Sequence, residues 1–96
     1  MKQYLIIAHD GKDDGALDRR KNVRPNHLAG AKKLKDKGNF VIGGAMLDEE
    51  NNMRGSIMIV QFESQEDFKK WYDNEPYLTG GVWKEIEVKP FRVAEV

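Results

Sequence analysis

Two histidines and a carboxylate are the residues of this sequence best suited to acid–base chemistry. His27 follows Pro25, and His9 and Asp10 end an apolar run near the N-terminus. Histidine has an ordinary pKa close to neutrality, so it can accept and donate a proton under physiological conditions. A neighbouring carboxylate fixes the tautomer of the ring and raises its basicity. The pattern therefore predicts proton-transfer chemistry, with His27 as general base or acid and Asp10 orienting it.

Both histidines also have a purely structural interpretation. His27 would then only pack against, or cap, the end of a sheet, and His9, which alternates with Ile7, would be an ordinary strand residue. Glu75 is the second carboxylate that we expect near His27, as a reserve acid or base. The sequence leaves both interpretations of His27 open.

Arginine, serine and tyrosine side chains supply candidate ligand contacts. Arg20, Arg24 and His27 share one face if helical geometry continues upstream of Pro25. Guanidinium groups bind carboxylates through two hydrogen bonds, so these arginines either hold an anionic ligand or form salt bridges within the chain. Ser56 lacks a nucleophile motif and is a hydrogen-bond donor to a ligand or a cap of a turn. The predicted ligand-binding residues are Arg20, Arg24, Ser56 and Tyr77.

Composition bounds the classes of protein that this chain can belong to. Its 96 residues make one domain, residues 1–96, and a hydrophobic content of 40% with 33% charged residues is typical of a globular protein. Lys and Arg number 16, as do Asp and Glu, so the basic excess of a nucleic-acid-binding protein is missing. There is no cysteine, and the histidines lack metal-ligand spacing.

No motif requires a cofactor, and no apolar run is long enough to cross a membrane. Met1 leads directly into a strand-like segment, so we expect no signal peptide and a cytoplasmic protein without membrane or nucleic-acid partners.

Apolar spacing predicts four strands and two helices. Pro25 suits the first position of a helix, and Gly38 suits the residue that ends it. Ser64 followed by Asp67 is a capping box that starts a second helix, which Pro76 would end. In chain order we expect a strand at 4–8, a helical turn at 16–23, a helix at 25–38, a strand from 40, a turn at 48–52, a strand at 56–62, a helix from 64, and an edge strand at 83–91.

The order strand, helix, strand, strand, helix, strand is that of the ferredoxin-like α+β fold. Right-handed crossovers place both helices on one face of a four-stranded antiparallel sheet. The central strands carry apolar residues on both of their faces, so the sheet face without helices is also apolar. A homodimer that packs sheet against sheet would cover it.

This topology brings the candidate residues to one end of the sheet. The first strand finishes there, the first helix begins there, and the segment carrying Glu75 and Tyr77 returns there. We expect His27 in the first turn of its helix, where the helix dipole favours the neutral ring, with Asp10 as its partner.

Several of these segments together resemble the YciI-like proteins. The resemblance rests on 4–10, Arg20, 23–28, Gly43-Gly44, Gly55-Ser56, Glu75-Pro76-Tyr77, Gly81-Val82 and Val88-Lys89-Pro90-Phe91, and it covers nearly the whole chain. It implies a dimeric α+β barrel with a site built around a histidine and an aspartate. His27 matches the family histidine, and Asp10 matches an aspartate that ends the first strand. Glu75 stands where the family usually carries aspartate, so its side chain is one methylene longer.

The resemblance and the residues together suggest an enzyme of the isomerase or lyase type. A related dehydrochlorinase and the muconolactone isomerase-type enzymes resemble the same barrel, so the expected ligand is a small anionic or phenolic molecule. Two alternatives remain: a non-catalytic module of the same fold that binds a small metabolite, and a haem- or oxygen-dependent monooxygenase.

Overall fold

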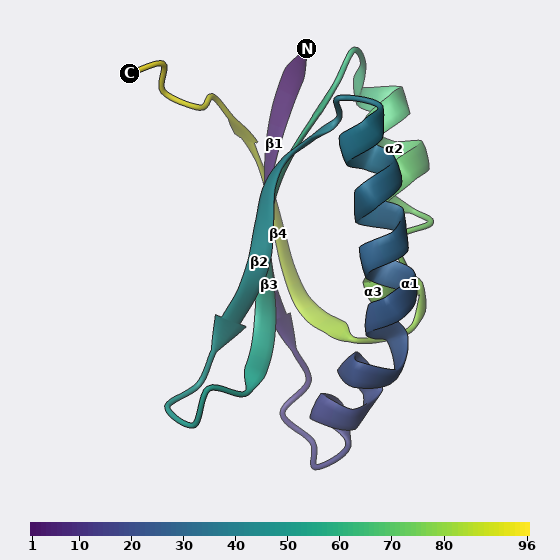
Figure 1. Cartoon of the computed structure of the whole chain (residues 1–96), viewed down its shortest axis with the longest axis vertical. Coiled ribbons are helices and arrows are strands. Elements are labelled where there is room, and N and C mark those ends of the chain that lie inside the picture. Colours follow the sequence, from purple (N-terminus) through teal and green to yellow (C-terminus); the bar gives the residue numbers. More distant parts are fainter.

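A computed structural model describes all 96 residues of the chain. It contains a single four-stranded sheet covered on one face by helices (Figure 1). The elements are β1 Lys2–Asp10, α1 Ala16–Asp36, β2 Phe40–Leu47, β3 Met53–Phe62, α2 Gln65–Tyr72, the short α3 Pro76–Thr79, and β4 Trp83–Phe91. The expected ferredoxin-like α+β architecture is confirmed.

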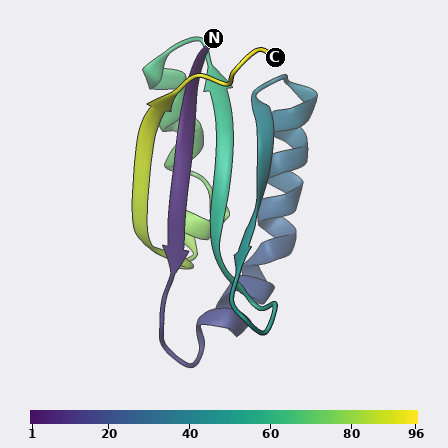
Figure 2. The ribbon, with the colours of Figure 1, turned by 90° about the vertical axis from the view of Figure 1, so that its left-hand side faces the viewer.

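The strand order is β2-β3-β1-β4, and every neighbouring pair is antiparallel. The first strand is central, as its apolar composition on both faces predicts. The predicted hairpin joins β2 and β3, and β4, with Pro90 near its end, forms an edge. Figure 2 shows the sheet from the side without helices. No helix of the chain is both long and apolar enough to span a bilayer.

The core lies between the sheet and the helices, and every second side chain of the central strands points into it. Tyr4, Ile6 and Ala8 of β1 are buried together with Met58, Val60 and Phe62 of β3. The second helix adds Phe68, which stacks on Tyr4 with ring centroids 4.2 Å apart. The same alternation turns Asp10 and Ser56 toward the helices, so the strands deliver two polar side chains to the end of an otherwise apolar layer.

The first helix begins nine residues earlier than the predicted start at Pro25, which lies inside it. Proline cannot donate to the carbonyl four residues before it, and that carbonyl belongs to Lys21, an exposed residue whose backbone can be hydrated instead. Ala16 and Arg20 are buried and anchor the first turns. His27 is therefore in the middle of α1, and the expectation that the helix N-terminus favours its neutral form is wrong. Gly38 adopts the expected left-handed conformation after the helix, with φ 78°.

Pro76 does not end the second helix, contrary to the prediction. That helix ends at Tyr72, and Pro76 is the first residue of α3. The first position of a helix suits proline because its missing N–H has no partner there. Glu75 caps this short helix through a hydrogen bond from the Tyr77 backbone N–H to Oε1, 3.1 Å long. The helix start predicted at Ser64 is confirmed, since its hydroxyl accepts from the Asp67 N–H, but the reciprocal bond of a capping box, from the Ser64 N–H to the Asp67 carboxylate, is not formed.

The sheet face opposite the helices is apolar at its centre. Leu5 and Ile7 of β1 pair with Ile59 and Ile57 of β3, and Ile42 of β2 pairs with Ile59. Ile42 is 60% exposed and Ile57 is 38% exposed. Charged residues of β4 border this central patch on one side. We call Leu5, Ile7, Ile42, Ile57 and Ile59 the bare-face patch.

The spacing of β1 and β3 depends on Gly55. A Cβ at this position would lie 2.5 Å from the Ala8 carbonyl oxygen, so we expect Gly55→Ala to lower the free energy of unfolding by about 1–3 kcal/mol. Gly44→Ala is the matched control, because a Cβ there meets no atom within 4 Å and should change stability by less than about 0.5 kcal/mol. Urea unfolding measures both, and equal effects would contradict the explanation.

Candidate functional site

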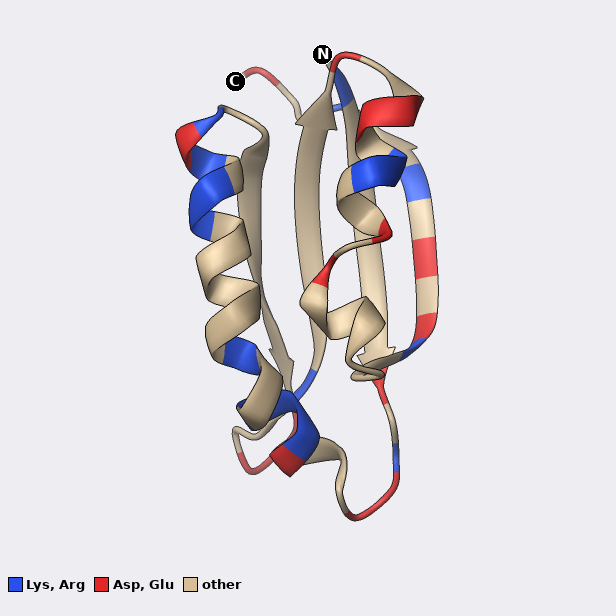
Figure 3. Ribbon diagram, turned by 90° about the vertical axis from the view of Figure 1, so that its right-hand side faces the viewer, with Lys and Arg blue, Asp and Glu red and all other residues tan.

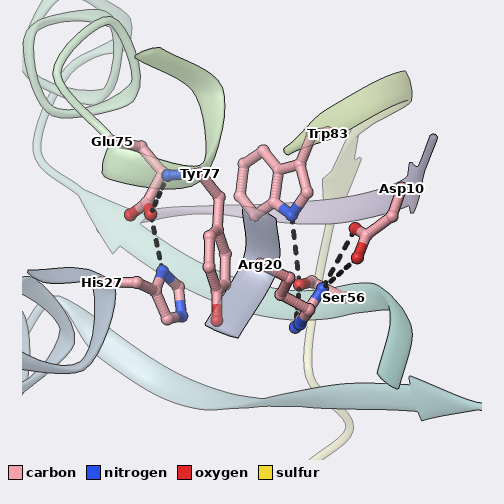
Figure 4. A network of polar contacts seen from close by, with 7 residues as sticks. All are labelled: Asp10, Arg20, His27, Ser56, Glu75, Tyr77 and Trp83. Carbon is pink, nitrogen blue, oxygen red and sulfur yellow. Dashed lines mark hydrogen bonds and ion pairs between the residues drawn. The ribbon is translucent and has the colours of Figure 1, made fainter. Parts of the chain in front are cut away.

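A buried ion pair joins the end of β1 to α1. Arg20 Nη1 donates to both carboxylate oxygens of Asp10, at 3.0 and 3.1 Å, and both side chains are almost completely buried. Arg20 Nη2 donates to Ser56 Oγ at 2.9 Å, and the Trp83 indole N–H donates to the same oxygen at 3.1 Å. The pair is thus tied to β3 and β4 as well (Figure 4). Among the buried side-chain nitrogen and oxygen atoms, only Arg20 Nε has no hydrogen-bond partner.

His27 pairs with Glu75 and not with Asp10, which corrects the sequence-based expectation. The distance from His27 Nδ1 to Glu75 Oε1 is 2.5 Å. Asp10 is unsuited to this role because Arg20 already occupies both of its oxygens. A carboxylate accepts and does not donate, so this contact places the proton of a neutral imidazole on Nδ1 and leaves Nε2 as a free acceptor. His27 is therefore oriented by Glu75 and not by the shorter Asp10.

Tyr77 lies between the two polar pairs. Its ring stacks on His27 with centroids 4.0 Å apart, and the Arg20 guanidinium carbon is 4.5 Å from the same ring centroid. Burial raises the pKa of the Tyr77 hydroxyl, with Arg20 and Arg24 opposing the shift, so the hydroxyl stays protonated near neutral pH. No side chain or backbone group hydrogen-bonds to this hydroxyl, which leaves a donor available beside His27 (Figure 4).

These residues line a small cavity of about 100 Å³ between α1 and β2. Helical spacing brings Arg20, Arg24 and His27 to one face of α1, as predicted for a helix that continues upstream of Pro25. Gly43 and Gly44 form part of the opposite wall, and Tyr77 completes it. Arg24 is exposed and makes no salt bridge, so it is an unpaired cation at this cavity.

Two other surface hollows differ from this cavity in character. The larger, about 740 Å³, lies at the loop between β1 and α1, and most of the residues that line it are exposed and charged. The other, about 480 Å³, lies between α1 and the segment α2–α3 and includes Glu75. We place the candidate site in the smaller cavity, because the unpartnered imidazole nitrogen and hydroxyl converge only there. No three His, Asp or Glu side chains converge as metal ligands.

The structure brings the predicted residues to one end of the sheet, where they form two groups: a buried network and a set of residues at the cavity. Asp10, Arg20 and Ser56 form the sealed network, so the salt-bridge interpretation of Arg20 is the one that the geometry matches. His27, Tyr77 and Arg24 line the cavity together with Arg20, and Glu75 contacts His27 without lining the cavity itself. His9 is exposed on the bare sheet face, as expected of an ordinary strand residue.

Trp83 is the network member that the sequence analysis missed. It is buried and pairs with Asp10 across the β1–β4 ladder. A buried tryptophan needs an acceptor for its indole N–H, and Ser56 was the polar residue whose strand placed it within reach.

The fold and this cavity together define a ferredoxin-like α+β protein with a histidine–carboxylate pair beside its sheet. The chain belongs to the YCII-related domain family, whose model matches residues 2–92. Protein YciI of Escherichia coli O6:H1 is 38% identical over 95 residues, covering 93% of this chain and 95% of the relative. A protein of Haemophilus influenzae is 35% identical over the same length and coverage.

Solved structures give the same architecture. The 5-chloro-2-hydroxyhydroquinone dehydrochlorinase of Burkholderia phenoliruptrix AC1100, in complex with 2,5-dihydroxybenzoquinone, is 25% identical with a TM-score of 0.79, covering 96% of this chain and 95% of the enzyme. A dimeric ferredoxin-like protein from Jannaschia sp. CCS1 is similar in fold alone, at 13% identity and a TM-score of 0.60, covering 97% of this chain and all of the other.

Two aspartate–arginine pairs beside the same loop allow a matched test of the buried network. Asp10→Asn leaves the Arg20 charge buried without a counter-ion, so we expect a loss of about 3–5 kcal/mol in the free energy of unfolding. Asp13→Asn breaks the solvent-exposed pair with Arg19, which lowers the pKa of Asp13 but is screened by water, and should change stability little. Urea denaturation compares the two, and a mild Asp10→Asn would contradict the importance of burial.

Proposed function

We propose that this protein is a small-molecule enzyme that transfers protons, as an isomerase or a lyase of the dehydrochlorinase type, without a cofactor. His27 is the general base or acid and acts through Nε2. The observation that carries the proposal is the imidazole held by Glu75 at Nδ1 while Nε2 remains unpartnered on a side chain that lines the cavity. Asp10 no longer orients the base in this proposal. It holds Arg20, and through Arg20 the position of Tyr77.

The groups around His27 suit an anionic or phenolic ligand. Tyr77 offers a neutral hydroxyl that can donate to an oxygen on which negative charge develops during proton removal. Arg24 adds an unpaired positive charge at the cavity. Abstraction of a proton by Nε2 would leave the electron pair of the broken bond on the substrate. In an elimination this electron pair expels a leaving group, and in an isomerisation the proton returns to a different atom of the substrate.

Similarity to the dehydrochlorinase supports the ligand class. Its structure contains 2,5-dihydroxybenzoquinone, a small planar molecule with acidic hydroxyl groups, and it matches nearly the whole of this chain. We therefore infer that this chain takes a hydroxylated aromatic or quinonoid compound of similar size.

A single subunit supplies only part of such a site. The cavity of about 100 Å³ is smaller than the roughly 300 Å³ at which ordinary ligand pockets begin. The bare-face patch is an apolar surface that a second copy would cover. We propose a homodimer that packs sheet against sheet through this patch, on the face of the sheet opposite the cavity.

The alternative is a non-catalytic module that binds the same ligand class in the same cavity. The sealed Asp10–Arg20 network favours it in one respect, because that pair stabilises the cavity wall and leaves no charged group of its own free for chemistry. The two proposals differ in whether His27 is needed for binding or for turnover.

Replacing His27 by alanine separates these alternatives. For an enzyme, chloride release from 5-chloro-2-hydroxyhydroquinone should fall by about 10²- to 10⁴-fold in kcat, since a positioned general base contributes that much. His9→Ala, the other histidine and exposed on the sheet, should retain wild-type kcat. Binding of 2,5-dihydroxybenzoquinone that survives His27→Ala, with no chloride released by the wild type, would favour the binding module.

The dimer is tested on the bare-face patch. Ile57→Lys places a charge within this patch, so we expect light scattering to give the mass of one chain, where the wild type gives twice that mass. Val96→Lys, an equally drastic change at the exposed C-terminus, should leave the dimer intact. A wild-type monomer at micromolar concentration would refute this part of the proposal.

A further inference from the structure

The His27–Glu75 pair stands between two separate hollows. His27 lines the small cavity between α1 and β2 but not the hollow on the outer side. Glu75 lines that outer hollow, which lies between α1 and the α2–α3 segment, but not the cavity. Figure 3 views the molecule from this helical side, with α1 on one side and α2 and α3 on the other. We call this hollow the outer groove.

The second carboxylate oxygen of Glu75 has no hydrogen-bond partner in the chain, and Glu75 is one of the residues that line the outer groove. Oε1 accepts both from His27 Nδ1 and from the Tyr77 backbone N–H, whereas Oε2 has no partner in the chain (Figure 4). Arg20 Nε is the only side-chain nitrogen or oxygen that is sealed and unpartnered. Glu75 Oε2 is therefore not completely sealed, although the Glu75 side chain is only 1% exposed, and the outer groove is the hollow that this residue lines.

Small side chains keep this groove open. Gly30 and Ala29 of α1 line it, and a Cβ at Gly30 would meet no atom within 4 Å. Glycine inside a helix costs about 1 kcal/mol relative to alanine, so the absence of a side chain here is not explained by helix stability.

We infer that Glu75 carries protons between His27 and water in the outer groove, on the side of the imidazole away from the ligand. The inference deepens the proposed function and rests on it for its purpose, because it supplies a general base with a route for regeneration. Glu75 is in this respect a positioning and relay residue, since it touches His27 and not the ligand.

The transfer balances in protons. When Nε2 takes a proton from the ligand, Nδ1 gives its own proton to Glu75 Oε1, so the ring stays neutral and the carboxylate becomes a carboxylic acid. A half-turn about the terminal side-chain torsion, which is broad and two-fold in glutamate, brings the protonated oxygen to the groove. Water there takes the proton. When Nε2 later gives its own proton to the product or to the leaving group, Glu75 takes a proton from water in the groove and passes it to Nδ1, so that the ring and the carboxylate return to their first state. The reverse sequence delivers a proton.

The outer groove suits this task because a bound ligand would not block it. The cavity opens between α1 and β2, so a ligand bound in it closes that path to water. The groove opens on the helical face, which a sheet-to-sheet dimer leaves free (Figures 2 and 3).

Hydrogen exchange of the His27 Nδ1 proton tests this route without any substrate. Gly30→Met fills the outer groove, and Ala31→Met, one residue further along α1, fills the inner cavity instead. With histidine labelled by ¹⁵N, the exchange rate with water is measured by NMR at constant pH and temperature. We expect Gly30→Met to slow exchange about tenfold or more, because exchange then awaits local opening of the helices, and Ala31→Met to leave the rate unchanged.

The outcomes are distinct. Slowing by Ala31→Met with an unaffected rate in Gly30→Met would overturn the inference, since protons would then leave through the cavity, and equal slowing in both variants would overturn it as well. If Gly30→Met does not fold, Ala29→Met occupies the same groove from the neighbouring position. Loss of the proposed enzymatic function would appear in the His27→Ala assay and not in this one, so the two failures are separable.

Discussion

The buried pair of Asp10 and Arg20 is the interaction on which the arrangement of this site depends. Two charges that are removed from water are stable only when their hydrogen bonds are well placed. Here Nη1 serves both carboxylate oxygens, Nη2 serves Ser56, and Trp83 completes the environment of that hydroxyl. Because these residues come from β1, α1, β3 and β4, the ion pair fixes α1 relative to three strands, and the position of His27 follows from that of the helix.

Tyr77 transmits this constraint to the imidazole. Its ring contacts the guanidinium of Arg20 and the ring of His27, and its backbone N–H holds the carboxylate that orients His27. One Glu75 oxygen therefore both caps α3 and fixes a tautomer. Asparagine or glutamine at this position could still accept these hydrogen bonds, but neither could exchange a proton with the ring at neutral pH.

Element order and the end of the sheet at which polar groups meet were predictable, because alternation in the strands and the capping residues Ser64 and Gly38 are local signals. The partner of His27 was not. Asp10 and Glu75 were both expected near it, and the choice depends on the buried Arg20, whose burial follows from α1 starting at Ala16. Pro25 suggested a later start, since a helix tolerates an internal proline only where the freed carbonyl meets water, which sequence alone does not reveal.

The number of residues in the first helix is also fixed by the site. Arg20, Arg24, His27 and Ala31 contact the cavity only because they recur on one face, and each added residue would rotate those beyond it by about 100° around the axis. A one-residue insertion between Arg20 and His27 would leave the ion pair in place and turn the imidazole away from Glu75. Insertions and deletions in related sequences should therefore occur in the hairpin turn at Asp48–Asn52 and be absent from α1.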